Sequence, residues 1–200
     1  MGPGAYMRIV FIGPAAMLPS AMKTYLTYGL AIALAGTVLN LALFFLGYHS
    51  DVAKFTTGQV IGGVGGIAIA VICIYLGTRA RGAEVPVSEP FGYGRALGAG
   101  AMIALFAALF SVVTTYLYFH VINPGINDVM MQAQIAKWEA AGLSSDRIEA
   151  AEAFMRKMMH PGVQAAFGFI AATITGTVIA LITSIFCRRE ATEAQPPTLA

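Results

Sequence analysis

Four long stretches of the chain contain no Asp, Glu, Lys or Arg. They cover residues 24–50, 55–78, 96–127 and 158–187. A helix needs about 20 apolar residues to cross the hydrocarbon core of a bilayer, so each stretch suffices for one crossing and is too short for two. An isolated strand is excluded there, because its backbone groups would stay unpaired in hydrocarbon. The pattern therefore predicts an all-α integral membrane protein with four spans, at about 24–48, 58–77, 95–122 and 162–187.

The segment between the third and fourth spans, residues 123–161, is predicted to form two short amphipathic helices outside the membrane. In the first, over 127–141, Met131 and Trp138 share one apolar face. The second begins after Ser144, a suitable N-cap, and also gathers its apolar residues on one face. We expect these helices to pack on each other as a hairpin or to lie on the membrane surface.

The remaining connections are polar or rich in proline. A short polar turn over 49–54 joins the first two spans, and an extended surface loop is expected over 78–94. Residues 1–21 and 190–200 are expected to be disordered tails outside the membrane domain, which covers 22–189. Because Met22 precedes Lys23 and an apolar span, it is a candidate for the true start of the protein.

Composition agrees with the membrane assignment and excludes several classes of protein. Hydrophobic residues make up 58% of the chain and charged residues 11%, against about 25% charged residues in soluble domains, so the apolar surface requires lipid. The formal charge of +2 is too small and dispersed for nucleic-acid binding. Two cysteines cannot provide a disulfide framework.

The distribution of Lys and Arg predicts the orientation in the membrane. With four spans, the N-terminus, the 78–95 loop and the C-terminus lie on one side, and their seven cations lie close to span ends. The opposite side carries five, of which Lys137 and Arg147 are far from any span. The positive-inside rule then places both termini in the cytoplasm and the 123–161 insert outside.

Small residues recur at every fourth position in three of the spans. Such stripes allow close approach of helix backbones, which drives helix association where lipid removes the hydrophobic incentive. We expect packing into one four-helix bundle, with homo-oligomerisation through the same faces as the alternative. The predicted packing positions are Gly58, Gly62, Gly66, Gly98, Gly168, Ala172 and Gly176.

The sequence contains few candidates for chemistry. Asn40 is the main strongly polar residue inside a span, and Thr37, Ser111, Thr114 and Thr175 are expected to form hydrogen bonds between helices. No P-loop, HExxH motif, nucleophile elbow or CxxC motif is present, and no cofactor is expected.

One group of residues supports the hypothesis of a metal site. All three histidines fall at outer span ends, beside acidic residues, and three imidazoles with a carboxylate are a suitable ligand set. The alternative is that histidine is simply tolerated at the interface. The candidate ligands are His49, His120, His160 and Asp51.

Short motifs along the chain resemble a bacterial membrane-protein family, the domain of unknown function four-one-nine-nine. They are Leu-Gly-Thr-Arg at 76–79, Tyr-Gly-Arg-Ala at 93–96, Ile-Asn-Pro at 122–124, Gly-Leu-Ser at 142–144 and Pro-Gly at 161–162. The resemblance covers about residues 22–189. It implies a bacterial inner-membrane protein with four spans and brings no established catalytic residues.

Three functions remain open at this point. The preferred one is a non-enzymatic scaffold or modulator of another envelope protein, with the outer hairpin as its docking surface. The second is a small oligomeric channel or carrier for an uncharged solute, because no ionisable residue lies at mid-membrane. The third is a subunit of a membrane enzyme or of a metal-handling system, which would need the histidines or residues of a partner.

Overall fold

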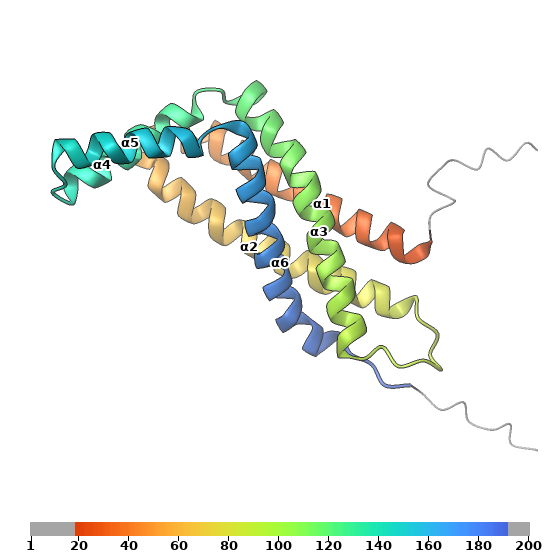
Figure 1. The fold of residues 1–200 in the computed structure, drawn as a ribbon. Coiled ribbons are helices and arrows are strands. Elements are labelled where there is room, and N and C mark those ends of the chain that lie inside the picture. The colour runs from red at the N-terminus through yellow and green to blue at the C-terminus, as the bar shows by residue number, and fades with distance from the viewer. Residues whose placement is uncertain (1–18, 192–200) are drawn as a thin grey trace, which may run out of the picture.

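The computed structural model describes residues 19–191, and this part of the chain is all-helical (Figure 1). Within these residues, four helices are long and apolar enough to cross a membrane, so the protein is a multi-pass membrane protein, as the sequence predicted. The elements in order are α1 (Ser20–Phe45), α2 (Val52–Ala83), α3 (Tyr93–Leu117), the π-helical turn η2 (Tyr118–Ile122), α4 (Ile126–Ala140), α5 (Ser145–Met158) and α6 (Pro161–Cys187).

The helix boundaries differ from the predicted ones mainly at α2. Its start moves back to Val52 because the Asp51 carboxylate accepts a hydrogen bond from the Ala53 N–H at 2.9 Å and caps the helix. Its end moves forward to Ala83, so the loop predicted to begin at residue 78 begins at 84. Cations are favourable near a helix C-terminus, which explains how Arg81 is accommodated in the last turn.

The predicted tails lie almost entirely outside the described residues. Of the tail predicted over 1–21, Ser20 and Ala21 belong to α1, and residues 1–18 are not described. Of the tail predicted over 190–200, only residues 190 and 191 are described.

Helix α3 is the centre of the bundle and packs tightly against α6. A Cβ atom built at Gly100 would lie 2.7 Å from the Cβ of Ala180, and one built at Gly176 would lie 2.5 Å from the Cβ of Ala104. These antiparallel helices therefore touch through small residues, as expected for helix association in a membrane. Ile103 is fully buried beside this contact.

Helices α1 and α2 also meet through glycine. A Cβ atom built at Gly65 would lie 2.7 Å from Leu39 of α1, and one at Gly62 would lie 3.3 Å from Leu43 of α1. A Cβ atom at Gly58 would lie 2.8 Å from Tyr48, in the turn that follows α1. The contacting positions are therefore 58, 62 and 65, a spacing of four and then three residues.

The predicted four-residue stripes are only partly correct. Gly58, Gly62 and Gly176 lie at close helix contacts, but a Cβ atom at Gly66, Gly98 or Gly168 would have no neighbour within 4 Å. Four residues of an α-helix turn through about 40° more than one full turn, so a stripe of this period drifts away from a straight contact face.

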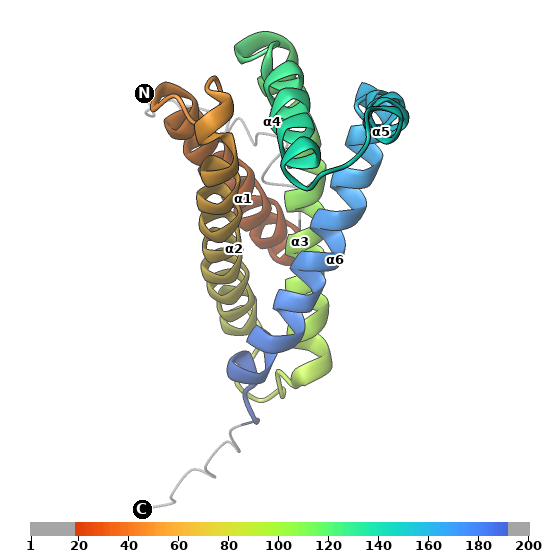
Figure 2. The ribbon, with the colours of Figure 1, turned by 90° about the vertical axis from the view of Figure 1, so that its left-hand side faces the viewer.

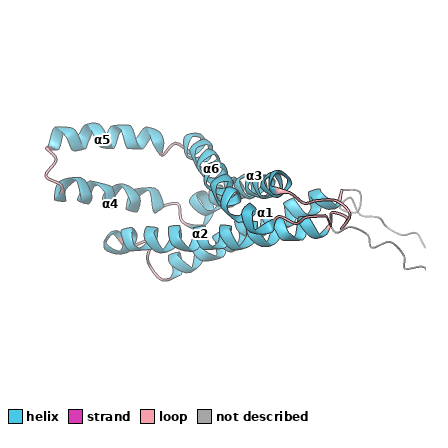
Figure 3. Ribbon diagram, turned by 90° about the horizontal axis from the view of Figure 1, so that it is seen from below, coloured by secondary structure: helices cyan, strands magenta, loops and turns pink. Residues whose placement is uncertain are grey.

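The α4–α5 hairpin lies at one end of the bundle, and its two helices have different environments (Figure 3). Helix α4 is anchored, because Ile126 and Ala133 are buried in a cluster with Phe55 and Tyr118. Helix α5 has no buried residue. The two predicted helices are thus confirmed, and buried side chains anchor α4, but not α5, to the bundle.

The opposite end of the bundle is closed by the chain leading out of α6. Phe91 and Arg189 exchange two backbone hydrogen bonds of 2.9 Å, which tie the 84–92 loop to the end of α6. Phe91 is almost completely buried there, with Ala96 and Cys187. We refer below to the hairpin end and the loop end of the bundle.

Candidate functional site: a cleft between α2 and α6

Helices α2 and α6 meet near the loop end and separate toward the hairpin end (Figure 2). Near the loop end, Ile74 of α2 is buried against Ile179 and Ala180 of α6. Toward the hairpin end, Gly66 on α2 and Gly168 on α6 have open space beside them. The separation leaves a cleft that has α3 as its floor and α4 across its hairpin end.

The largest cavity that adjoins this cleft has a volume of about 480 Å³ and lies between α1, α2 and α3, beneath the start of α4. It meets the space between α2 and α6 at Gly62, Gly63 and Ser111. This volume falls in the range of roughly 300–1,000 Å³ that is usual for small-molecule sites. In the part of the chain that the structure describes, no Asp, Glu, Lys or Arg lines it. The polar side chains that line it are Thr37, Asn40, His49, Gln59, Ser111, Thr114, Thr115 and Tyr118.

Three polar side chains of α1 and α3 that line the cavity form hydrogen bonds within their own helix and not across the cavity. The Thr37 hydroxyl donates to the Ala33 carbonyl at 2.8 Å, and the Asn40 amide donates to the Gly36 carbonyl at 3.1 Å. The Thr114 hydroxyl likewise donates within α3. The predicted hydrogen bonds between helices are therefore wrong for Thr37 and Thr114, and Asn40 likewise bonds within its own helix.

This bonding pattern leaves hydrogen-bonding capacity facing the cavity. An amide side chain has two donor hydrogens and an acceptor oxygen, and a hydroxyl can accept as well as donate. Asn40 uses one donor hydrogen for Gly36, and its carbonyl oxygen takes part in no hydrogen bond within residues 19–191. A molecule with hydroxyl or amide groups could therefore bond to several sides of the cavity at once.

A buried polar network closes the cavity at the hairpin end. The His49 Nδ1 atom lies 2.6 Å from the Tyr118 hydroxyl, and the Asn123 side-chain amide donates to the His49 carbonyl at 3.3 Å. All three residues are buried. Removal from water disfavours the charged imidazole, so burial lowers the pKa of His49 from its ordinary value of 6.5.

The π-helical turn η2 provides the geometry of this network. The Asn123 N–H donates to the Tyr118 carbonyl at 2.8 Å, which closes a wider turn than an α-helix has. A residue that precedes a proline disfavours the α conformation, so the helical backbone ends at Ile122, and Asn123, ahead of Pro124, is no longer helical. Turns of this kind are frequent at functional sites.

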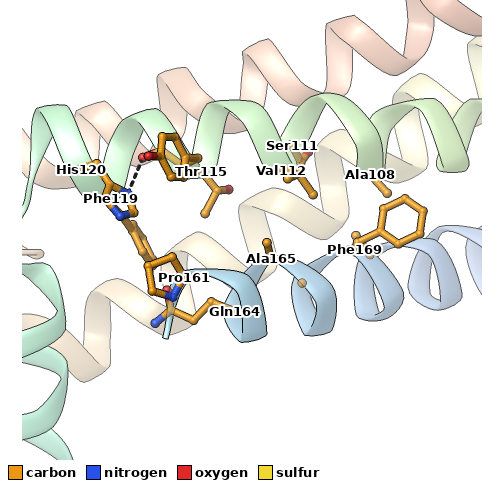
Figure 4. Close-up of a pocket in the computed structure, with 13 residues that line it drawn as sticks. Ala108, Ser111, Val112, Thr115, Phe119, His120, Pro161, Gln164, Ala165 and Phe169 are labelled. Carbon is orange, nitrogen blue, oxygen red and sulfur yellow. Dashed lines mark hydrogen bonds between the residues drawn. The ribbon is translucent and has the colours of Figure 1, made fainter. Parts of the chain in front are cut away.

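A second cavity, of about 240 Å³, lies between α3 and α6 (Figure 4). Its hairpin end is polar: His120 stacks on Tyr116 with ring centroids 4.2 Å apart, and Gln164 donates to the Asn127 side chain at 3.2 Å. Its other end is lined by small or apolar residues, among them Ala108 and Phe169.

A third recess, of about 340 Å³, lies deeper between α2, α3 and α6 and is almost entirely apolar. Ser111 lines all three spaces. They therefore border one stretch of α3, and the cleft is polar toward the hairpin end and apolar toward the middle of the bundle.

The structure does not bring the four proposed metal ligands together. All three histidines lie at the hairpin end, but residues 19–191 contain no group of three His, Cys, Asp or Glu side chains that could hold a metal ion. Asp51 caps α2. His120 is two positions after Tyr118, the partner of His49, and positions two apart on a helix point to nearly opposite sides.

Some residues that line the cavity could be identified from the sequence, and others could not. Asn40, Ser111 and Thr114 were recognised as polar residues inside spans, which was the available signal. Gln59 and Tyr118 were missed. Gln59 lies in a span that is otherwise apolar, and nothing in its surroundings in the sequence indicated a role. Tyr118 lies near a span end, where tyrosine is common for reasons unrelated to a binding site.

Comparison with known proteins gives a family but no activity. No curated protein and no solved structure matches the chain. The family model described as "Protein of unknown function (DUF4199)" matches residues 27–189, which include all four spans except the first residues of α1. The chain therefore belongs to the DUF4199 family.

Proposed function

We propose that the protein is a small carrier or channel that binds an uncharged molecule in the polar cavity that adjoins the cleft between α2 and α6. The observation that supports this most strongly is the polar cavity inside the membrane domain. Side chains of three spans face it, and the Asn40 carbonyl oxygen is open to a ligand. Polar groups inside a membrane domain are costly, and they commonly line the path or site of a solute.

The lining supports an uncharged ligand. Burying an ion is costly unless an opposite charge or several hydrogen bonds compensate. Within residues 19–191 no Asp, Glu, Lys or Arg lines the cavity, and burial favours the uncharged form of His49 by lowering its pKa. A molecule that carries hydroxyl or amide groups matches this site better than an anion or a cation.

Binding can be tested with the purified protein in nanodiscs against neutral polyols and neutral amphiphiles. A ligand present at 100 times its Kd should stabilise the folded protein by about 2.7 kcal/mol. Thr114→Val and Asn40→Leu should lower affinity at least tenfold, because each removes a polar group from the cavity. Thr56→Val is the matched control, since Thr56 is exposed and outside the cavity. Equal affinities in all four proteins would refute the site.

A second candidate function, the scaffold, is favoured by α5. A helix with no buried residue leaves a surface available to an envelope protein. Its charged side carries Arg156 and Lys157. If a defined envelope protein co-purifies with this chain, reversing both charges should abolish co-purification, whereas Lys54→Glu should not.

We also propose the location and sidedness: the inner membrane of a bacterium, with both termini in the cytoplasm. The supporting feature is the distribution of cations in the fold. Arg79, Arg81, Arg95, Arg188 and Arg189 gather at the loop end, next to the spans. Cations of this kind mark the cytoplasmic side. The hairpin end, and with it the polar cavity, would then lie toward the outer face.

A further inference from the structure

We infer that the ligand of the cleft is a neutral amphiphile that enters sideways from the bilayer. The inference rests on the proposed function and specifies its ligand. The polar group of the ligand lies in the cavity between α1, α2 and α3, and its hydrocarbon chain lies between α2 and α6. Three features of the cleft lead to this assignment.

The first feature is that the cleft is open along its side. Cβ atoms built at Gly63, Gly66 and Gly168 would meet nothing within 4 Å, although these positions lie inside membrane-spanning helices. Ile67 lines the deep recess, yet 53% of its surface is exposed. The surface exposed at this depth faces hydrocarbon, so a molecule dissolved in the bilayer reaches the cleft without crossing water.

The second feature is the order of polarity along the cleft. His49, Gln59 and Tyr118 are at the hairpin end, where the spans reach the membrane surface. Ala70 and Ile179 line the recess toward the middle of the bundle. A lipid has the same order, with its polar group at the surface and its chain inside. The cleft can therefore hold such a molecule without turning it.

The third feature is the absence of charge from the whole lining. Among the described residues that line the three spaces, none is Asp, Glu, Lys or Arg. A phosphate or a carboxylate held there would have lost its water without gaining a cation. A head group of hydroxyls, esters or amides can instead bond to Asn40 and to the hydroxyl groups of α3.

The test uses a monoacylglycerol with a photoreactive diazirine in its acyl chain and the full chain in phosphatidylcholine nanodiscs. After irradiation, crosslinks should concentrate on the peptides around Gly63–Gly66 and Gly168–Ala172. Ala172→Phe places a large ring where two of the spaces meet and should reduce this labelling at least tenfold. Ala166→Phe is the matched control, because Ala166 is exposed on the same helix and lines none of the spaces. Both substitutions are at exposed positions, and unchanged thermal unfolding verifies that each variant folds.

Competition identifies the class of ligand. Unlabelled monoacylglycerol should displace the probe, whereas phosphatidic acid at the same concentration should not. Labelling spread evenly over all lipid-exposed helices, or equal in Ala172→Phe and the parent, would overturn the inference, because the probe would only be part of the surrounding lipid. Specific binding of a water-soluble polyol without labelling by the probe would overturn the inference but leave the proposed function standing. Binding of neither would refute both.

Discussion

At the scale of single residues, the hydrogen bond between His49 and Tyr118 is the contact with the clearest energetic consequence. Tyr118→Phe removes the hydroxyl and leaves a buried imidazole nitrogen without its partner at 2.6 Å. A buried polar group without a partner costs about 1–3 kcal/mol. We expect the free energy of unfolding to fall by that amount, measured by denaturation in a mild detergent. Tyr116→Phe, at an exposed tyrosine two residues earlier, should change it little.

The same network predicts a dependence of stability on pH. Burial lowers the pKa of His49 in the folded protein, whereas unfolded His49 has a pKa near 6.5. Below that pH the unfolded state binds a proton that the folded state does not, so the free energy of unfolding falls as the pH is lowered. The decrease ends at the pKa of the folded state. His49→Gln should flatten the profile between pH 7 and the acid limit of folding, and an unchanged profile would show that His49 is not the group responsible.

Glycine substitutions should separate true contacts from open positions. Gly176→Leu forces a side chain against Ala104, because a Cβ atom at position 176 would lie 2.5 Å from the Cβ of Ala104. Overpacking of this kind costs about 1–3 kcal/mol or more. For a protein of this length each kcal/mol lowers the Tm by roughly 2–4 °C. Gly62→Leu should cost less, because its neighbour is the flexible end of Leu43 at 3.3 Å. Gly66→Leu should leave the Tm almost unchanged, and a loss equal to that of Gly176→Leu would show that Gly66 is also a packing position.

At the scale of whole elements, the sequence was sufficient wherever one physical constraint acted alone. The need to pair every backbone group in hydrocarbon fixed the number and type of the spans, and α1, α3 and α6 start and end within a few residues of the prediction. The break in the helix at 123–125 is explained locally as well, by the effect of Pro124 on the residue before it. These constraints are local, so they can be recognised without knowledge of the fold.

The cleft could not be predicted, because it depends on how far the helices diverge. The same four-residue repeat of small residues gives a contact at Gly62 and open space at Gly66. A polar residue inside a span, such as Asn40 or Thr114, can form a hydrogen bond to another helix or face a cavity. Which of the two occurs depends on the arrangement of the helices in space. The π-helical turn that positions Tyr118 has no recognisable signature in residues 118–122.

Helix α5 should lie in the membrane interface. Two residues, Met159 and His160, separate it from α6, which enters the membrane at Pro161, and α5 runs across the direction of α6 (Figure 2). Its apolar side is incompletely covered, since 65% of the Phe154 surface is exposed. Amphipathic helices in such a position bury their apolar face among the lipid head groups and acyl chains.

An environment-sensitive fluorophore can test this placement. Attached through Phe154→Cys in liposomes, it should show blue-shifted emission and quenching by nitroxide-labelled lipid. Attached through Ala153→Cys, about 100° further round the helix, it should emit as in water. If both positions report water, α5 stands away from the bilayer, and its apolar face is available to a partner protein.

At the scale of the whole molecule, the orientation in the membrane decides from which leaflet a ligand reaches the cleft. If the cations at the loop end mark the cytoplasm, then the hairpin lies at the outer face and the polar cavity in the outer half of the membrane. Ser145→Cys, at the exposed start of α5, should then react in intact cells with a thiol reagent that cannot cross the membrane. Val87→Cys, in the exposed loop at the other end, should react only after the cells are opened. Background from native thiols should be low, because Cys187 is buried and Cys73 is half-buried in a spanning helix. The reverse result would place the polar cavity in the cytoplasmic half of the bilayer, and the neutral amphiphile would then have to come from the inner leaflet.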